Sequence, residues 1–153
     1  MRIIYQNADG GCSVIAPAPN SDLTIEEIAA KDVPTGVPFR IVPDEAVPAD
    51  RTYRNAWVAD VDGGRVGHDM PKAREIHKQH MRVARTPLLG TLDTAYLRAD
   101  ELGGPGAAAT KGSIAAQKQV LRDVTARPDL IAAQTVAELK AVWPAVLGAN
   151  PLL

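Results

Sequence analysis

Residues 70–101 have the sequence MPKAREIHKQHMRVARTPLLGTLDTAYLRADE, the longest stretch of the chain without a glycine cluster. Apolar residues recur in it at helical spacing, with His80 among them. Asp69 is placed to cap the start of a helix, and Pro71 lies in the first turn, where proline is tolerated. The stretch therefore predicts an amphipathic helix that needs a packing partner. The apolar face of this helix comprises Ala73, Ile76, Val83, Leu88, Leu92, Ala95, Ala99 and Leu102.

Pro87 interrupts the helical pattern. Proline has no backbone N–H and clashes with the preceding turn, which costs ~3 kcal/mol inside a continuous helix. We therefore expect a kink at Pro87, or two helices over residues 72–85 and 87–101. The glycine turn at residues 103–106 ends the helical structure, and residues 107–112 are expected to be flexible.

Return helices follow this turn. Residues 113–125 place Ile114 and Leu121 on one side at helical spacing. Thr135 and Glu138 form a capping box that opens another helix, which extends to about residue 142. A short helical turn is expected between them, at residues 130–133. Trp143, before a proline, is expected to dock the last helix onto the long one.

The N-terminal part has the signals of β-hairpins. Asp-Gly-Gly turns, which supply positive φ angles, occur at residues 9–11 and 62–64 between segments rich in β-branched and apolar residues. A capping box at Thr24 and Glu27 opens a short helix between the hairpins. The expected strands cover residues 2–6, 12–16, 37–42, 57–61 and 65–67, and the expected short helix covers residues 25–31.

These patterns predict an α+β chain with two parts. Residues 1–67 form a small module of β-hairpins with one short helix. Residues 68–153 form a C-terminal α-helical hairpin or bundle, with the long helix broken near Pro87.

Composition excludes several classes of protein. The 153 residues are 46% hydrophobic and carry a net charge of −1, so nothing drives the whole chain toward nucleic acid or an anionic membrane. Cys12 is the only cysteine, which excludes an intrachain disulfide and a thiolate zinc cluster and fits a reducing compartment. No apolar run reaches the ~20 residues that span a bilayer, and the N-terminus lacks the features of a signal peptide. We expect a cytoplasmic protein, unless it leaves the cell as part of an assembly.

Five basic residues lie close together in the first half of the long helix, with Glu75 as the only acid among them. The simplest interpretation is a solvated helix face; the alternatives are a partner-binding surface and a nucleic-acid patch. These residues are Lys72, Arg74, Lys78, Arg82 and Arg85.

Residues 49–57, ADRTYRNAW, form the densest polar and aromatic cluster of the chain. Asp50 can cap the following turn. Arg51 and Arg54 could line a binding pocket, but the structural interpretation is favoured, in which Tyr53 and Trp57 cover the sheet while both arginines pair with local carboxylates and carbonyls.

No catalytic constellation is apparent. His77 and His80 could reach one metal ion from a helix, but no zincin glutamate lies between them, so structural histidines are favoured. No serine lies in a nucleophile elbow, and nothing would lower the pKa of Cys12. We therefore expect a non-enzymatic interaction protein without cofactor or metal.

Several strings resemble small proteins encoded by tailed phages and prophages. These are VPADRTYRNAW at residues 47–57, DMPKA at 69–73, an arginine-rich segment at 82–85 followed by Leu92-Asp93, and KQVLRD at 118–123. The second half is also similar to phage tail and tail-fibre assembly chaperones, through Leu121-Arg122-Asp123 and Trp143-Pro144.

The resemblance implies a protein that binds phage tail or tail-fibre proteins. It would be an assembly chaperone in the host cytoplasm or a structural component of the virion tail, and it could form homo-oligomers. A phage regulator that binds nucleic acid through residues 72–85 is the alternative.

Overall fold

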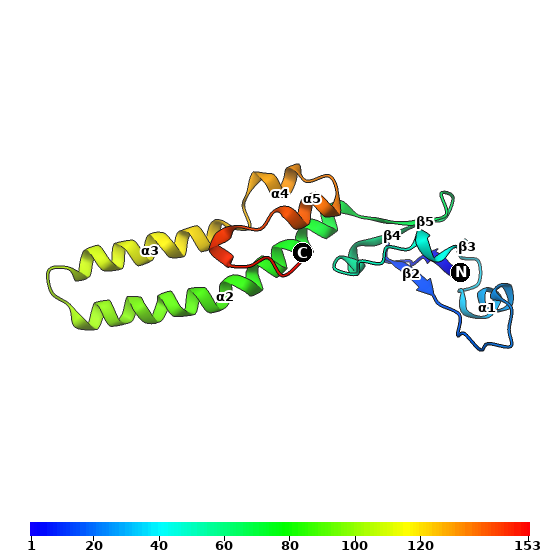
Figure 1. The fold of residues 1–153 in the computed structure, drawn as a ribbon, viewed down its shortest axis with the longest axis horizontal. Coiled ribbons are helices and arrows are strands. Elements are labelled where there is room, and N and C mark those ends of the chain that lie inside the picture. Colours follow the sequence, from blue (N-terminus) through cyan, green and yellow to red (C-terminus); the bar gives the residue numbers. More distant parts are fainter. The chain divides into compact units, whose positions relative to one another are not determined.

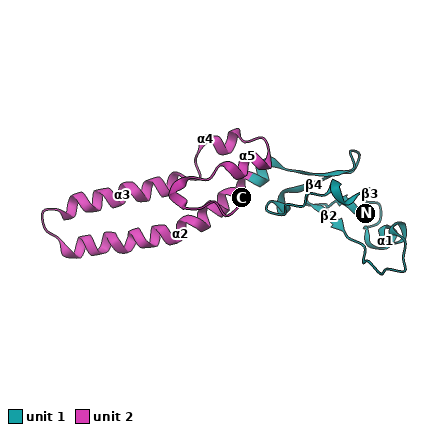
Figure 2. Cartoon of the chain, in the orientation of Figure 1, with its two compact units in different colours: residues 1–73 teal, residues 74–153 magenta.

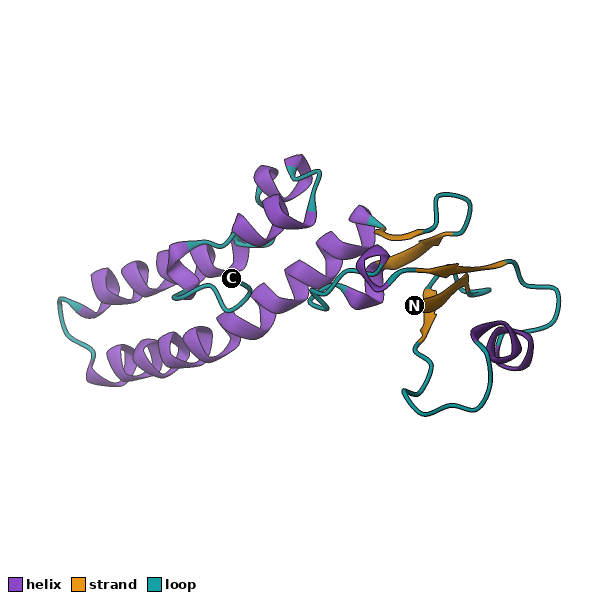
Figure 3. Ribbon diagram, turned by 45° about the vertical axis from the view of Figure 1, so that its right-hand side comes forward, coloured by secondary structure: helices purple, strands orange, loops and turns teal.

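A computed structural model describes all 153 residues of the chain (Figure 1). The chain is α+β, as predicted, and forms two compact units, residues 1–73 and residues 74–153 (Figure 2). Every strand belongs to the first unit, and the second contains helices and loops only (Figure 3). The division falls in the first turns of the long helix α2 (Met70–Leu102), a few residues after the predicted boundary.

A three-stranded antiparallel sheet in the order β2-β1-β3 confirms the first predicted hairpin and the third strand. Ile3 in the central strand lies opposite Ile15 on one side and Ile41 on the other. The hairpin turn needs glycine, because Gly10 has a φ of 80°. The strands are β1 (Arg2–Gln6), β2 (Cys12–Ile15) and β3 (Phe39–Val42).

The second predicted hairpin forms a separate two-stranded sheet of β4 (Trp57–Asp60) and β5 (Arg65–His68). Asp60 closes its turn by accepting a hydrogen bond of 2.8 Å from the backbone N–H of Gly63. A Cβ atom at Gly63 would lie 2.2 Å from a carboxylate oxygen of Asp60, so a side chain there would displace the carboxylate that closes the turn.

Strand β1 is covered on both faces because successive side chains of a strand point to opposite sides. Ile3 packs with Ile28 of helix α1 (Ile25–Asp32), whereas Ile4 packs with Trp57 and Val66 of the second sheet. The predicted capping box begins α1: Thr24 and Glu27 exchange hydrogen bonds of 3.2 and 2.8 Å. Two short 3₁₀ helices complete the unit, η1 (Asp44–Ala46) and η2 (Arg54–Ala56).

The second unit is built around a helical hairpin, in which α2 and α3 lie side by side (Figures 1 and 3). Despite its length, α2 is not apolar enough to cross a membrane, and neither is any other helix. The elements that follow α2 are α3 (Ala107–Asp123), α4 (Pro128–Ala132), α5 (Val136–Ala141) and the 3₁₀ helix η3 (Ala145–Leu147).

Of the two alternatives predicted at Pro87, a kink or a division into two helices, the division is wrong, because α2 continues through this residue. The carbonyl of Val83 loses the backbone donor that Pro87 cannot supply, but Val83 is 63% exposed and water can take that place. The hydroxyls of Thr86 and Thr91 donate hydrogen bonds of 2.8 and 3.1 Å to the carbonyls of Arg82 and Pro87. The missing bond is therefore tolerated on a solvated side of the helix.

The buried stripe in the first half of α2 differs from the predicted one. His77 and Met81 are fully buried, whereas Val83, expected on the stripe, is exposed. Residues 77 and 81 follow Ala73 at intervals of four, so the stripe includes a histidine that apolar periodicity does not count. The prediction of a flexible segment at residues 107–112 is also wrong, because α3 begins at Ala107.

Candidate functional site

The hairpin of α2 and α3 turns at two glycines that require left-handed backbone. Gly103 and Gly104 have φ angles of 58° and 82°, which other residues rarely adopt. Beyond this turn, α3 runs back along α2 and exposes a different surface on each side of the hairpin.

One side of the hairpin is closed by ion pairs between the two helices. Lys111 of α3 lies 2.6 Å from the carboxylate of Asp100 of α2, and Lys118 pairs with Asp93. The ring of Tyr96 lies between these pairs, 5.9 and 5.1 Å from the two ammonium groups. Such cation–π contacts add to the pairing, so this side of the hairpin is polar and its charges are paired between the two helices.

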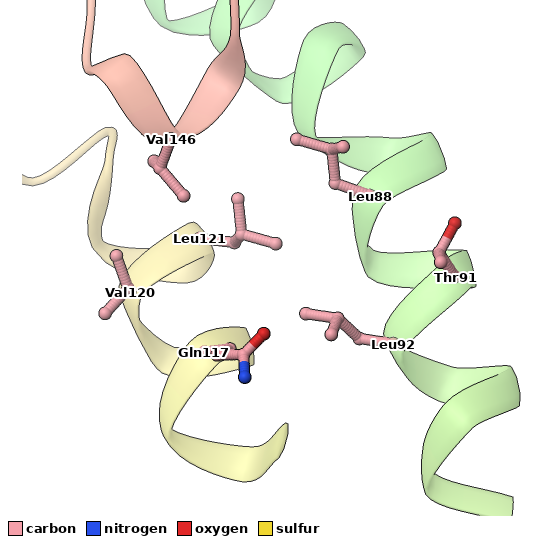
Figure 4. Close-up of a pocket in the computed structure, with 7 residues that line it drawn as sticks. All are labelled: Leu88, Thr91, Leu92, Gln117, Val120, Leu121 and Val146. Atoms are coloured by element: carbon pink, nitrogen blue, oxygen red, sulfur yellow. The ribbon is translucent and has the colours of Figure 1, made fainter. Parts of the chain in front are cut away.

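The other side carries an apolar groove of about 320 Å³ (Figure 4). Leu88 and Leu92 of α2 and Leu121 of α3 point toward one another across it, and Val146 of η3 closes one end. No lining residue is charged. We call this feature the α2/α3 groove, and its lining comprises Leu88, Thr91, Leu92, Gln117, Val120, Leu121 and Val146.

The groove combines a buried floor with exposed walls. Leu121 is 3% exposed, whereas Leu88, Val120 and Val146 are 36%, 54% and 43% exposed. Apolar surface in contact with water favours burial by ~25 cal/mol per Å². Three exposed aliphatic side chains around one hollow are therefore a surface that gains free energy when another apolar surface covers it.

A second hollow of about 410 Å³ extends the apolar side toward the hairpin turn. Its α2 residues include Ala95, Ala99 and Leu102, which continue from Leu88 and Leu92 at intervals of three and four and so lie on the same helix face. Leu102 is 86% exposed. The apolar face of the hairpin thus continues beyond the groove.

Most of the predicted partner-binding residues are bound within the helical unit. Arg74 donates a hydrogen bond of 2.7 Å to the carbonyl of Ala133, and Lys78 pairs with Glu75 at 2.6 Å. Arg82 donates to Gln79 at 3.5 Å.

Arg85 has a structural role at the end of a neighbouring helix. It donates to the carbonyls of Leu121 and Arg122 at 3.4 and 3.0 Å, at the C-terminal end of α3, where a cation is favourable. Lys72, in the first unit, is exposed. The five residues remain predicted partner contacts, but at least Arg74 and Arg85 also hold the fold.

The 49–57 cluster is only partly as predicted. Tyr53 and Trp57 are 0% and 4% exposed, which confirms them as anchors, and burial raises the pKa of the Tyr53 hydroxyl. Asp50 caps the following turn by accepting the N–H of Thr52 at 3.0 Å. The prediction that the Arg51 and Arg54 side chains pair locally is wrong, because both residues are exposed and neither guanidinium group makes a hydrogen bond or an ion pair.

The predicted motif Leu121-Arg122-Asp123 lies at the C-terminal end of α3. Leu121 is buried and forms part of the floor of the α2/α3 groove. Asp123 accepts a hydrogen bond of 2.8 Å from the side chain of Gln119. Arg122 is exposed, and its carbonyl accepts the bond from Arg85.

His77 joins the segment after α5 to α2. Its Nε2 lies 2.8 Å from the carbonyl oxygen of Val142, and its ring meets that of Trp143 edge to face at 6.0 Å. This contact confirms the predicted docking of Trp143 on the long helix. Burial lowers the pKa of His77, and the carbonyl contact opposes that effect.

No three His, Cys, Asp or Glu side chains lie close enough together to hold a metal ion. Burial raises the pKa of the Cys12 thiol, which disfavours the reactive thiolate.

Thr91 and Val146 had no role in the sequence-based hypotheses, and Val120 appeared only within the string at residues 118–123. The signal for Val120 was present, because Val120-Leu121 places two apolar residues side by side and widens the apolar stripe of α3 beyond one row. Val146 carried no such signal, since it reaches the groove only through the path of the chain after α5.

No protein-family model matches this chain, and no curated protein and no solved structure was found to resemble it.

Proposed function

We propose that this chain is a non-enzymatic protein-binding component whose α2/α3 groove receives an apolar segment of another protein. The observation that carries the proposal is the uncharged groove on one side of the hairpin, with Leu88, Val120 and Val146 exposed around the buried Leu121. An amphipathic helix laid in a groove between two helices is a recurrent mode of protein recognition.

The partner we propose is a phage tail or tail-fibre protein, as the sequence motifs imply. The chain would serve either as a chaperone during tail assembly in the host cytoplasm or as a structural part of the tail. An exposed apolar groove suits both roles, because it is covered only when the partner is bound. Presence at fixed stoichiometry in purified virions would support the structural role, and absence from them the chaperone role.

The alternative of nucleic-acid binding through residues 72–85 is less favoured. Two of its five basic side chains, Arg74 and Arg85, donate to backbone carbonyls of other segments of the helical unit, which leaves fewer of them available for phosphates.

The test is a calorimetric titration of the full chain with purified phage tail and tail-fibre proteins, the partners proposed above. Val120→Asp places a charge on the groove wall at a position that is already 54% exposed, so folding should be preserved. We expect binding to weaken at least tenfold, because the carboxylate would be desolvated in an apolar interface.

Val83→Asp is the matched control, because Val83 lies on the same hairpin, is 63% exposed and does not line the groove. Its affinity should equal that of the parent chain. Equal weakening by both substitutions, or none by Val120→Asp, would contradict the proposal. Sedimentation of the chain alone shows whether a second copy occupies the groove instead.

A further inference from the structure

The first unit contains a hollow of about 380 Å³ that the proposed function does not use. It lies wholly within residues 1–73 and is therefore independent of the α2/α3 groove. Its size falls within the range of small-molecule sites. Its walls combine apolar side chains with three arginines, and the residues that matter here are Val14, Val47, Trp57, Arg2, Arg51 and Arg54.

The only acid that lines this hollow is already neutralised. The carboxylate of Asp44 lies 2.8 Å from the N-terminal ammonium group and 3.3 Å from the guanidinium of Arg2. These two cations hold the pKa of Asp44 below its usual range. Asp44 is therefore paired with the N-terminal ammonium group and Arg2 and does not balance the charge of the other arginines.

Arg51 and Arg54 are the arginines of the hollow whose side chains are unpaired. The guanidinium group of neither residue makes a hydrogen bond or an ion pair. Asp50, next to Arg51 in the chain, is bound instead by the N–H and hydroxyl of Thr52 at 3.0 and 2.6 Å. Two guanidinium groups three residues apart thus line one hollow without an anion to balance them.

Trp57 forms the aromatic part of the wall. It is 4% exposed, and its indole N–H has no acceptor within the protein. Arginine forks match the geometry of phosphate and carboxylate groups, and an aromatic wall suits an apolar body attached to such a group.

We propose that this hollow binds a small organic anion, whose phosphate or carboxylate group pairs with Arg51 and Arg54 while its apolar part lies against Trp57. The two arginines supply the charge, and the fixed indole and valines select ligands with an apolar body over bare inorganic anions.

The test follows the indole N–H signal of Trp57 in a ¹H–¹⁵N NMR spectrum of the full chain, assigned with Trp143→Phe. Phenyl phosphate and benzoate are the two probes, which distinguish phosphate from carboxylate. For ligands of this size we expect saturable shifts with a Kd on the order of 1 mM for at least one of them. Inorganic phosphate should bind at least tenfold more weakly than phenyl phosphate.

The variant Arg51→Gln/Arg54→Gln should weaken binding at least tenfold, and both positions are exposed, so the fold should persist. Arg122→Gln, which removes another exposed arginine without a side-chain partner, should leave binding unchanged. No saturable shift with either probe, an unchanged Kd in the double variant, or equal binding of uncharged benzyl alcohol would overturn the proposal.

Discussion

Replacing Pro87 with alanine should stabilise the helical unit, because α2 continues through this position. Proline in a helix interior is ~3 kcal/mol less favourable than alanine, since it removes one hydrogen bond and crowds the preceding turn. Alanine also increases the conformational entropy of the unfolded chain, which lowers the free energy of unfolding by roughly 0.4–1 kcal/mol. The net gain in the free energy of unfolding is therefore about 2 kcal/mol.

Urea unfolding followed by far-UV circular dichroism measures this gain, because most of the helix lies in residues 74–153. With a slope of about 2 kcal/mol per M, the midpoint should rise by about 1 M. Gly90→Ala is the matched control on the same helix, where an added Cβ meets nothing within 4 Å, and it should give only about 1 kcal/mol. A Pro87→Ala midpoint that falls, or rises no more than that of Gly90→Ala, would refute a continuous helix at Pro87.

Two further predictions concern side chains that hold the helical unit together. Burial lowers the pKa of His77 below its ordinary 6.5. The stability that neutral His77 contributes is therefore complete above pH 6.5 and is lost as the pH falls below 6.5 toward the folded-state pKa. Urea midpoints should fall more between about pH 7.5 and about pH 5.5 in the parent chain than in His77→Gln, and equal falls would contradict this role. Arg85→Gln should lower the free energy of unfolding by about 1 kcal/mol, because it removes a charged donor from the end of α3. DNA binding at low salt should be negligible in the parent chain and in Arg85→Gln. Salt-dependent DNA binding that Arg85→Gln weakens would instead favour the regulator.

Local chemistry predicted much of the fold. The Asp-Gly-Gly turns and the capping box at Thr24 act over a few residues, and the structure contains both hairpins and α1 where these signals placed them. At α5 the cap is only partly as expected: Thr135 accepts from Glu138, but the Glu138 carboxylate reaches the N–H of Gln134. Such shifts by one residue lie beyond what a spacing pattern can resolve.

The errors have physical causes that involve the rest of the unit. The cost of Pro87 is a local quantity, whereas packing of α2 on α3 and hydration around Val83 decide whether the helix continues. His77 is polar by type, and the contact of its Nε2 with the carbonyl of Val142, which offsets the cost of burial, joins residues far apart in the sequence.

Sequence patterns could not predict the α2/α3 groove, because the groove depends on how neighbouring elements pack. Its α2 side was predicted as an apolar face, but the periodicity of one helix does not show which part of that face its neighbour leaves open. Val146, which closes one end of the groove, is placed there by η3, and that placement is a tertiary property.

The most direct test of the proposed binding is site-specific photocrosslinking in cells that also produce the proposed phage tail and tail-fibre partners, with a benzophenone amino acid at position 120 and, in a parallel strain, at position 83. Binding in the α2/α3 groove predicts a crosslink from position 120 to a tail or tail-fibre protein and none from position 83. No crosslink to a tail protein from position 120, or equal yields from both positions, would contradict it.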